Sequence, residues 1–199
     1  MSNTKRKTNE REFWFVVGSQ MLYGEAVLRT VEQRAEEMAR EMSKSLPCKL
    51  IYKTTVKDAD EATRIMKEAN AADECCGVVT WCHTFSPSKM WIEGMRLLQK
   101  PLCHFATQYN RTIPDNEIDM DFMNLNQSAH GDREHGFLTA RMRLPHKVIM
   151  GYWQDEAPLR ELGEWMRAAV GMSFSRSLKI MRFGDNMREV AVTEGDKVE

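Results

Sequence analysis

The runs FWFVV, at Phe13–Val17, and GVVTW, at Gly77–Trp81, decide the fold class of this 199-residue chain. Both are apolar at nearly every position, without the alternation of a half-exposed strand. Such strands are buried on both faces, which is typical of parallel sheets covered by helices on either side. Four further runs read as strands: Lys49–Lys53, Pro101–Phe105, Lys147–Trp153 and Leu178–Phe183.

Amphipathic helical stretches separate these runs. The expected helices cover residues 27–42, 58–70, a segment that begins at 86–87, and 155–170. Asp58 caps the second of them while Glu61 reaches back, and Gly171 is expected to end the last one. The alternation of strand and helix predicts an α/β fold with a doubly wound, mainly parallel sheet of the Rossmann or flavodoxin-like kind.

The pattern weakens near residues 171–177 and then resumes in the run LKIMRF. We therefore expect an N-terminal α/β domain over residues 1–174 and the beginning of a second α/β domain over 175–199. Residues 1–11 are basic and polar, and we expect them to be disordered.

Composition excludes several classes of partner. The chain has 28 basic and 29 acidic residues and a formal net charge of -1, so bulk charge predicts no nucleic-acid partner. No apolar run approaches the roughly 20 residues that a membrane span needs. Five cysteines without a C-x-x-C pair read as reduced thiols, and the first residues lack the apolar segment of a signal peptide, so we expect a cytoplasmic protein.

Polar and aromatic residues follow three strands of the predicted sheet, where ligands of open α/β sheets bind. The first strand leads into GSQMLYGE, the third into His83 and Thr84, and the fourth into a segment with His104, Gln108 and Tyr109. Sugars need this mixture of hydrogen-bonding groups and rings. Ordinary strand-to-helix turns and structural histidines explain the same residues. Nucleotide binding lacks support because no phosphate-binding glycine loop is present.

Residues 108–136 break the alternation, and we interpret them as a functional connection or a loop-helix excursion in which Phe122, Met123 and Leu125 are buried. His130 and His135 lie five residues apart, which does not align two ligands on one helical face. Cys82 and His83 are neighbours in a strand and point to opposite faces. The residues alone predict no metal site and no self-contained catalytic set.

Several long stretches resemble the L-arabinose isomerase family. They are FWFVVGSQMLYGE, WCHTFSPSKMW, LLQKPLCHFATQYN, IDMDFMNLNQSAHGDREHGF, GYWQD and RFGDNMREVAVTEGDKVE. They occur in the family's order from about Glu12 to Glu199. Met21 is a departure, because the family motif usually has histidine there.

The resemblance implies an aldose–ketose isomerase that interconverts L-arabinose and L-ribulose with a divalent metal, usually Mn²⁺, and that assembles into homohexamers. The resemblance also implies D-galactose as a second sugar substrate. The resemblance implies sugar-pocket roles for Gln20, Leu22, Phe85, Gln127, His130 and Met187. Phe85, Gln127 and His130 would reach into a neighbouring subunit's site.

The family's two metal-binding glutamates and two histidines would lie beyond residue 199. We therefore expect this chain to supply sugar-pocket and interface residues, to hold no metal and to be inactive alone. The alternative is a non-catalytic α/β module for sugar binding or subunit interaction.

Overall fold

The structure is a computed structural model that describes residues 11–84, 88–116 and 118–184. Its strands are β1 (Glu12–Gly18), β2 (Lys49–Val56), β3 (Cys75–Cys82), β4 (Leu102–Ala106) and β5 (Lys147–Met150). Its helices are η1 (Met21–Tyr23), α1 (Gly24–Met42), α2 (Ala59–Ala71), η2 (Ser88–Trp91), α3 (Ile92–Leu97), α4 (Met120–Asn124), α5 (Ser128–Arg141) and α6 (Glu156–Arg176). Within the described ranges, no helix has both the length and the apolar character to cross a bilayer.

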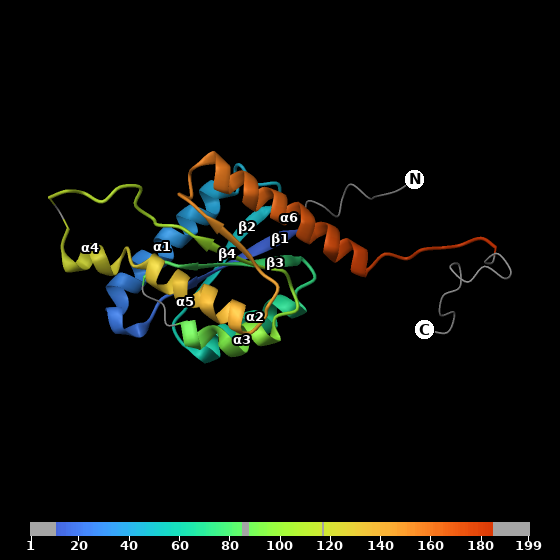
Figure 1. The fold of residues 1–199 in the computed structure, drawn as a ribbon, viewed down its shortest axis with the longest axis horizontal. Coiled ribbons are helices and arrows are strands. Elements are labelled where there is room, and N and C mark those ends of the chain that lie inside the picture. The colour runs from blue at the N-terminus through green and yellow to red at the C-terminus, as the bar shows by residue number, and fades with distance from the viewer. Residues whose placement is uncertain (1–10, 85–87, 117, 185–199) are drawn as a thin grey trace.

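All five strands are parallel and form one sheet in the order β2-β1-β3-β4-β5 (Figure 1). The chain winds outward from β1 in one direction to β2, and in the other direction through β3, β4 and β5. This is a doubly wound, Rossmann-like α/β fold, and it confirms the predicted class.

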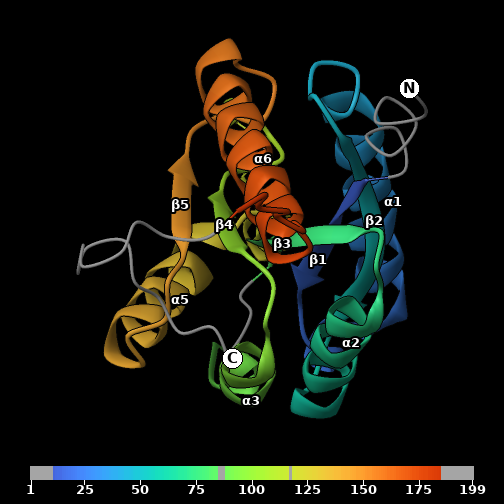
Figure 2. The ribbon, with the colours of Figure 1, turned by 90° about the vertical axis from the view of Figure 1, so that its right-hand side faces the viewer.

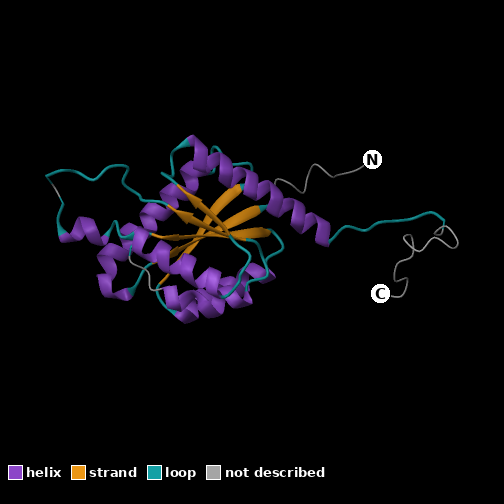
Figure 3. Cartoon of the chain, in the orientation of Figure 1, coloured by secondary structure: helices purple, strands orange, loops and turns teal. Residues whose placement is uncertain are grey.

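Helices cover both faces of the sheet, which explains why its central strands have no polar side (Figures 2 and 3). Phe13 and Phe15 of β1 pack into a core that α1 and α6 complete. Trp14 and Val16 point the other way, into a core formed with α2, η2 and α3. Because successive side chains of a strand alternate between faces, the run FWFVV has to be apolar throughout.

The start of α2 matches its predicted cap. A side-chain oxygen of Asp58 accepts a hydrogen bond from the backbone N–H of Glu61 at 2.8 Å. The Glu61 carboxylate in turn accepts from the backbone N–H of Lys57 at 2.9 Å. Such caps satisfy backbone donors that the helix leaves open and contribute about 1 kcal/mol each.

The predicted end of α6 is wrong, because the helix continues through Gly171 to Arg176. A helical glycine costs about 1 kcal/mol relative to alanine, which contacts further along can outweigh. Arg11 donates to the hydroxyl oxygen of Ser173 at 2.9 Å, and Arg176 donates to the carbonyl oxygen of Gln99 at 3.1 Å. These two bonds tether the last turns of the helix to the body of the domain.

Two predicted strands also differ. β5 ends at Met150 rather than Trp153, because Gly151 adopts a φ of 146° that breaks the strand. Residues 178–183 form no strand, and Ile180 and Phe183 are 86% and 90% exposed. A strand needs a partner for its backbone groups, and the described residues place none beside this segment.

Candidate functional site

The carboxyl ends of β1 and β3 lie where the strand order reverses, because β1 leads to β2 on one side and β3 leads to β4 on the other. In open α/β sheets this reversal is where ligands bind. Ser19 follows β1 and Thr84 follows β3. Both side chains are buried, and their hydroxyl oxygens lie 2.8 Å apart. The two loops are thus joined at the reversal point.

A stack of rings stands beside this point. The His83 ring lies 4.5 Å from the Trp81 ring and 6.1 Å from the Tyr109 ring, centroid to centroid. Arg34 covers the Tyr109 ring at 4.3 Å, and its Nη1 lies 3.4 Å from Nε2 of His83. Burial lowers the pKa of His83 to about 3, so this imidazole is neutral at pH 7 and accepts from Arg34.

Two hydrogen bonds hold the Tyr109 end of the stack. The Tyr109 hydroxyl donates to a carboxylate oxygen of Glu37 at 2.7 Å, and the indole N–H of Trp153 donates to the Tyr109 carbonyl oxygen at 3.1 Å. The long connection after β4 therefore starts from a fixed position. Trp81 and His83 are buried and Tyr109 is partly exposed, so Tyr109 is the ring of this stack that offers surface to a ligand.

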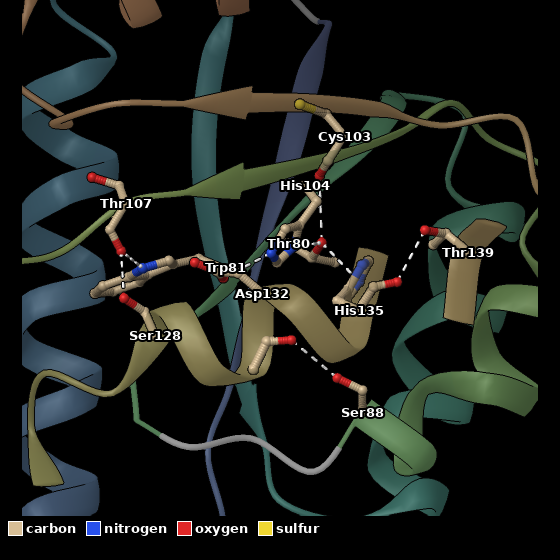
Figure 4. A network of polar contacts seen from close by, with 11 residues as sticks. Thr80, Trp81, Ser88, Cys103, His104, Thr107, Ser128, Asp132, His135 and Thr139 are labelled. Atoms are coloured by element: carbon tan, nitrogen blue, oxygen red, sulfur yellow. Dashed lines mark hydrogen bonds and ion pairs between the residues drawn. The ribbon is translucent and has the colours of Figure 1, made fainter. Parts of the chain in front are cut away.

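The N-terminal part of α5 is held against the sheet by polar contacts (Figure 4). The Ser128 hydroxyl donates to the carbonyl oxygen of Thr107 at 2.8 Å, and the indole of Trp81 donates to the same oxygen at 2.9 Å. The Ser88 hydroxyl donates to the carbonyl oxygen of Gly131 at 3.2 Å. These contacts position the residues at the start of α5, which include Gln127 at its N-cap.

Four of the six predicted sugar-pocket residues lie in the described part of the chain. Gln20 is half-buried and precedes η1, whereas Leu22 on η1 is 84% exposed. Gln127 is half-buried, and His130 is exposed on the first turn of α5. Phe85 and Met187 lie outside the described residues.

Gln127 lines a cavity of about 340 Å³ formed by the connection between β4 and α5. Its other lining residues are Gln108, Asn110, Thr112, Ile113, Ile118, Phe122, Met123 and Asn126. The predicted loop-helix excursion is confirmed by α4 and α5, but Met123 is 48% exposed rather than buried. Neither Gln20 nor Leu22 is among the described lining residues, so the cavity and η1 are separate parts of the candidate site.

His104 is not at a strand exit as the sequence indicated. It lies inside β4, is buried, and faces α5, where its Nε2 is 2.8 Å from Oδ1 of Asp132. Its Nδ1 lies 2.9 Å from the Thr80 hydroxyl. This pairing is not visible in the sequence, because a strand residue and a helix residue 28 positions later share no local pattern.

Among the described residues, one group of three metal-ligating side chains has its ligand atoms within reach of a single ion: Cys82, His104 and Asp132. It contains a thiol and no glutamate. It therefore does not fit the two-glutamate, two-histidine set that the resemblance implies for manganese. The described residues of the sheet edge that are partly exposed to a ligand are Gln20, Gln108 and Tyr109.

Family models match nearly the whole chain. The model of the L-arabinose isomerase N-terminal domain matches residues 7–177, and that of the central domain of the same enzyme matches residues 179–199. The chain belongs to the L-arabinose isomerase family. This confirms the resemblance seen in the sequence motifs.

Individual family members match over almost the full chain. L-arabinose isomerase 2 of Clostridium acetobutylicum is 56% identical over 195 residues, which are 97% of this chain and 40% of that protein. The L-arabinose isomerase of Geobacillus kaustophilus is 57% identical over 189 residues, covering 94% of this chain and 38% of its own length. That of Erwinia tasmaniensis is 55% identical, with coverage of 96% and 38%. The chain thus spans about two fifths of the length of these L-arabinose isomerases.

Proposed function

We propose that the protein to which this chain belongs isomerises L-arabinose to L-ribulose, and that this chain supplies one wall of the sugar pocket. The observation that carries the proposal is the 56% identity, across 97% of the chain, to a protein named L-arabinose isomerase. The comparisons do not favour the alternative of a non-catalytic sugar-binding or subunit-interaction module.

The sugar wall is proposed to consist of Gln20, Leu22, Phe85, Gln127, His130 and Met187. The two glutamines and the histidine offer amide and imidazole groups to sugar hydroxyls, and the other three offer apolar surface. The half-burial of Gln127 supports this role, since the amide lines a cavity while its backbone starts a helix that the sheet holds in place.

Isomerisation moves protons between adjacent carbons and between their oxygens, which requires acid and base groups and a polarising metal. Mn²⁺ is proposed to supply that polarisation when bound to the full enzyme. Because the metal-ligating group of the described residues does not fit the family's manganese set, we propose that the isolated chain is inactive. Its own residues bind and orient the sugar.

A homo-oligomer, the hexamer implied by the resemblance, is proposed as the assembly. The 84% exposure of Leu22 and the exposure of His130 support this assembly. A sugar-pocket residue that is exposed in one chain becomes buried when a neighbouring copy packs against it. L-arabinose is the proposed substrate, with D-galactose as a second sugar. The proposed setting is the cytoplasm, supported by the five cysteines, all of which are thiols in the structure.

A domain boundary at residues 174–175 is also proposed. The two family models support it because the first ends at residue 177 and the second begins at residue 179. The exposed segment after α6 is consistent with a connection between two units.

A chimera tests the proposed activity. Residues 1–199 of this chain would replace the matching segment of the Clostridium acetobutylicum enzyme, to which they are 56% identical. We expect the purified chimera to form L-ribulose from L-arabinose in the presence of Mn²⁺. A folded chimera of the parent's oligomeric state that forms no L-ribulose, while the parent does, would contradict the proposal.

A further inference from the structure

The polar cluster beneath α5 unites two strands and a helix (Figure 4). β3 and β4 pair with Thr80 opposite His104, and Cys82 lies two residues further along β3, on the same face as Thr80. Asp132 lies on α5, and its side chain contacts His104 on this face of the sheet. The Cys82 sulfur, a His104 ring nitrogen and an Asp132 oxygen all lie within 4.8 Å of one another. The fold thus gathers three metal-ligating groups of different chemistry at one point.

We propose that Cys82, His104 and Asp132 bind one divalent cation of borderline softness, with Zn²⁺ as the preferred ion. Thiolate and imidazole are ligands that Zn²⁺ prefers, and it accepts a carboxylate as well. The thiolate and carboxylate together carry two negative charges. They balance the charge of the ion, so the bound site is neutral in surroundings where Cys82 and His104 are fully buried.

The spacing of the three groups suits such an ion. Tetrahedral zinc, with bonds of about 2.0–2.3 Å, holds its ligand atoms about 3.3–3.8 Å apart. The atoms here lie within 4.8 Å of one another, and Nε2 of His104 lies 2.8 Å from Oδ1 of Asp132. Binding therefore requires side-chain shifts on the order of 1 Å rather than a rearrangement of the backbone.

A fourth ligand position has access to solvent. His104 and Asp132 line a groove of about 820 Å³ that also borders Thr107, Gln108 and Met150. Three protein ligands with an open fourth position is the arrangement of zinc sites that hold water or a small ligand.

Binding of the ion requires that its three ligand atoms carry no proton. The Cys82 thiol and the Asp132 carboxyl lose their protons to solvent, and His104 carries its ring proton on Nδ1 rather than Nε2. Nδ1 then donates to the Thr80 hydroxyl, 2.9 Å away, and that hydroxyl faces the carbonyl oxygen of Cys103 at 3.4 Å. Metal-ligating histidines usually have such an acceptor behind them. Burial raises the pKa of Asp132 to about 8, because it disfavours the charged carboxylate, and a bound cation stabilises that carboxylate.

Zn²⁺ titration of the 199-residue chain tests the proposal, with Co²⁺ as a spectroscopic probe. We expect one tightly bound ion per chain, a sulfur-to-cobalt charge-transfer band, and a melting temperature raised by roughly 5–10 °C at a hundredfold excess of Zn²⁺ over Kd. Cys82→Ser should abolish the charge-transfer band. His104→Gln and Asp132→Asn should each weaken Zn²⁺ binding at least about tenfold.

Cys103→Ser is the matched control, because Cys103 is also a buried thiol and precedes His104 in β4. The Cys103 side chain packs on the opposite face of the sheet, in the core formed with α1 and α6. Cys103→Ser should leave the charge-transfer band and the affinity unchanged. Circular dichroism establishes that each variant is folded, and Asp132→Asn retains a hydrogen-bonding side chain should Cys82→Ser fail to fold. Absence of stoichiometric binding, or equal binding by Asp132→Asn and the unsubstituted chain, would overturn the proposal.

Discussion

The hydroxyl oxygen of Ser19 lies 2.8 Å from that of Thr84, and this buried hydrogen bond joins the loops that leave the two central strands of the sheet. From this point the chain leads from β1 to β2 on one side of the sheet and from β3 to β4 on the other. The bond therefore holds Ser19, which directly precedes Gln20, against Thr84 at the end of β3. A change here is expected to alter the stability of the domain and the geometry of its sheet edge.

Replacement of Ser19 by alanine should lower the free energy of unfolding by about 1–3 kcal/mol, because the Thr84 hydroxyl would remain buried without this partner. The double variant Ser19→Ala, Thr84→Val should lose less than the sum of the two single variants, since both polar groups are then gone. Urea unfolding measures both values, with the exposed Ser175→Ala as control. Strict additivity would show that the two hydroxyls do not interact.

Gly94 and Gly171 should respond in opposite ways to alanine. A Cβ at Gly94 would lie 2.8 Å from the backbone oxygen of Ala62, so Gly94→Ala should destabilise the contact of α3 with α2 by about 1–3 kcal/mol. A Cβ at Gly171 meets nothing within 4 Å, and the residue is helical, so Gly171→Ala should stabilise the chain by about 0.5–1 kcal/mol. Thermal unfolding compares the two. Destabilisation by Gly171→Ala would mean that α6 ends at this glycine.

His83 should make the chain sensitive to acid. Burial lowers its pKa from the ordinary 6.5 to about 3, so the unfolded chain binds a proton that the folded chain excludes between these values. The contribution of neutral His83 is fully present above about pH 6.5 and is lost as the pH falls towards 3. His83→Phe retains a ring in the stack but has no group to protonate. As the pH falls, its unfolding free energy should therefore decrease less than that of the unsubstituted chain, with a difference between the two slopes on the order of 1 kcal/mol per pH unit.

Urea unfolding at several pH values between 4 and 7 checks this prediction. His130→Phe serves as the control because it makes the same substitution at an exposed position. Equal slopes for His83→Phe and the unsubstituted chain would show that His83 is charged in the folded state.

The fold class could be predicted because it depends on local patterns. FWFVV is apolar throughout since both sheet faces are covered, and the cap at Asp58 needs only residues within one helical turn. The end of α6 could not be predicted in this way. Gly171 carries a local stop signal, but contacts of Ser173 and Arg176 with distant residues outweigh it.

The candidate site shows the same division. Ser19 and Thr84 were placed at strand ends because strand limits are visible in the sequence. His104 was assigned to the sheet edge, whereas it lies inside β4, which continues to Ala106. Its partner Asp132 comes from a helix with no clear apolar stripe, so only the folded chain brings the two side chains together.

The value of kcat/KM for L-arabinose in the chimera that carries Gln127→Ala tests the central claim most directly. The chimera carries residues 1–199 of this chain, and the exposed Arg133→Ala on the same helix is the control. We expect Gln127→Ala to lower kcat/KM for L-arabinose about tenfold or more, as for a lost sugar hydrogen bond, while the Mn²⁺ concentration for half-maximal activity stays unchanged. Unaltered kcat/KM, or equal losses in sugar turnover and Mn²⁺ affinity, would contradict the assignment of this chain to the sugar wall.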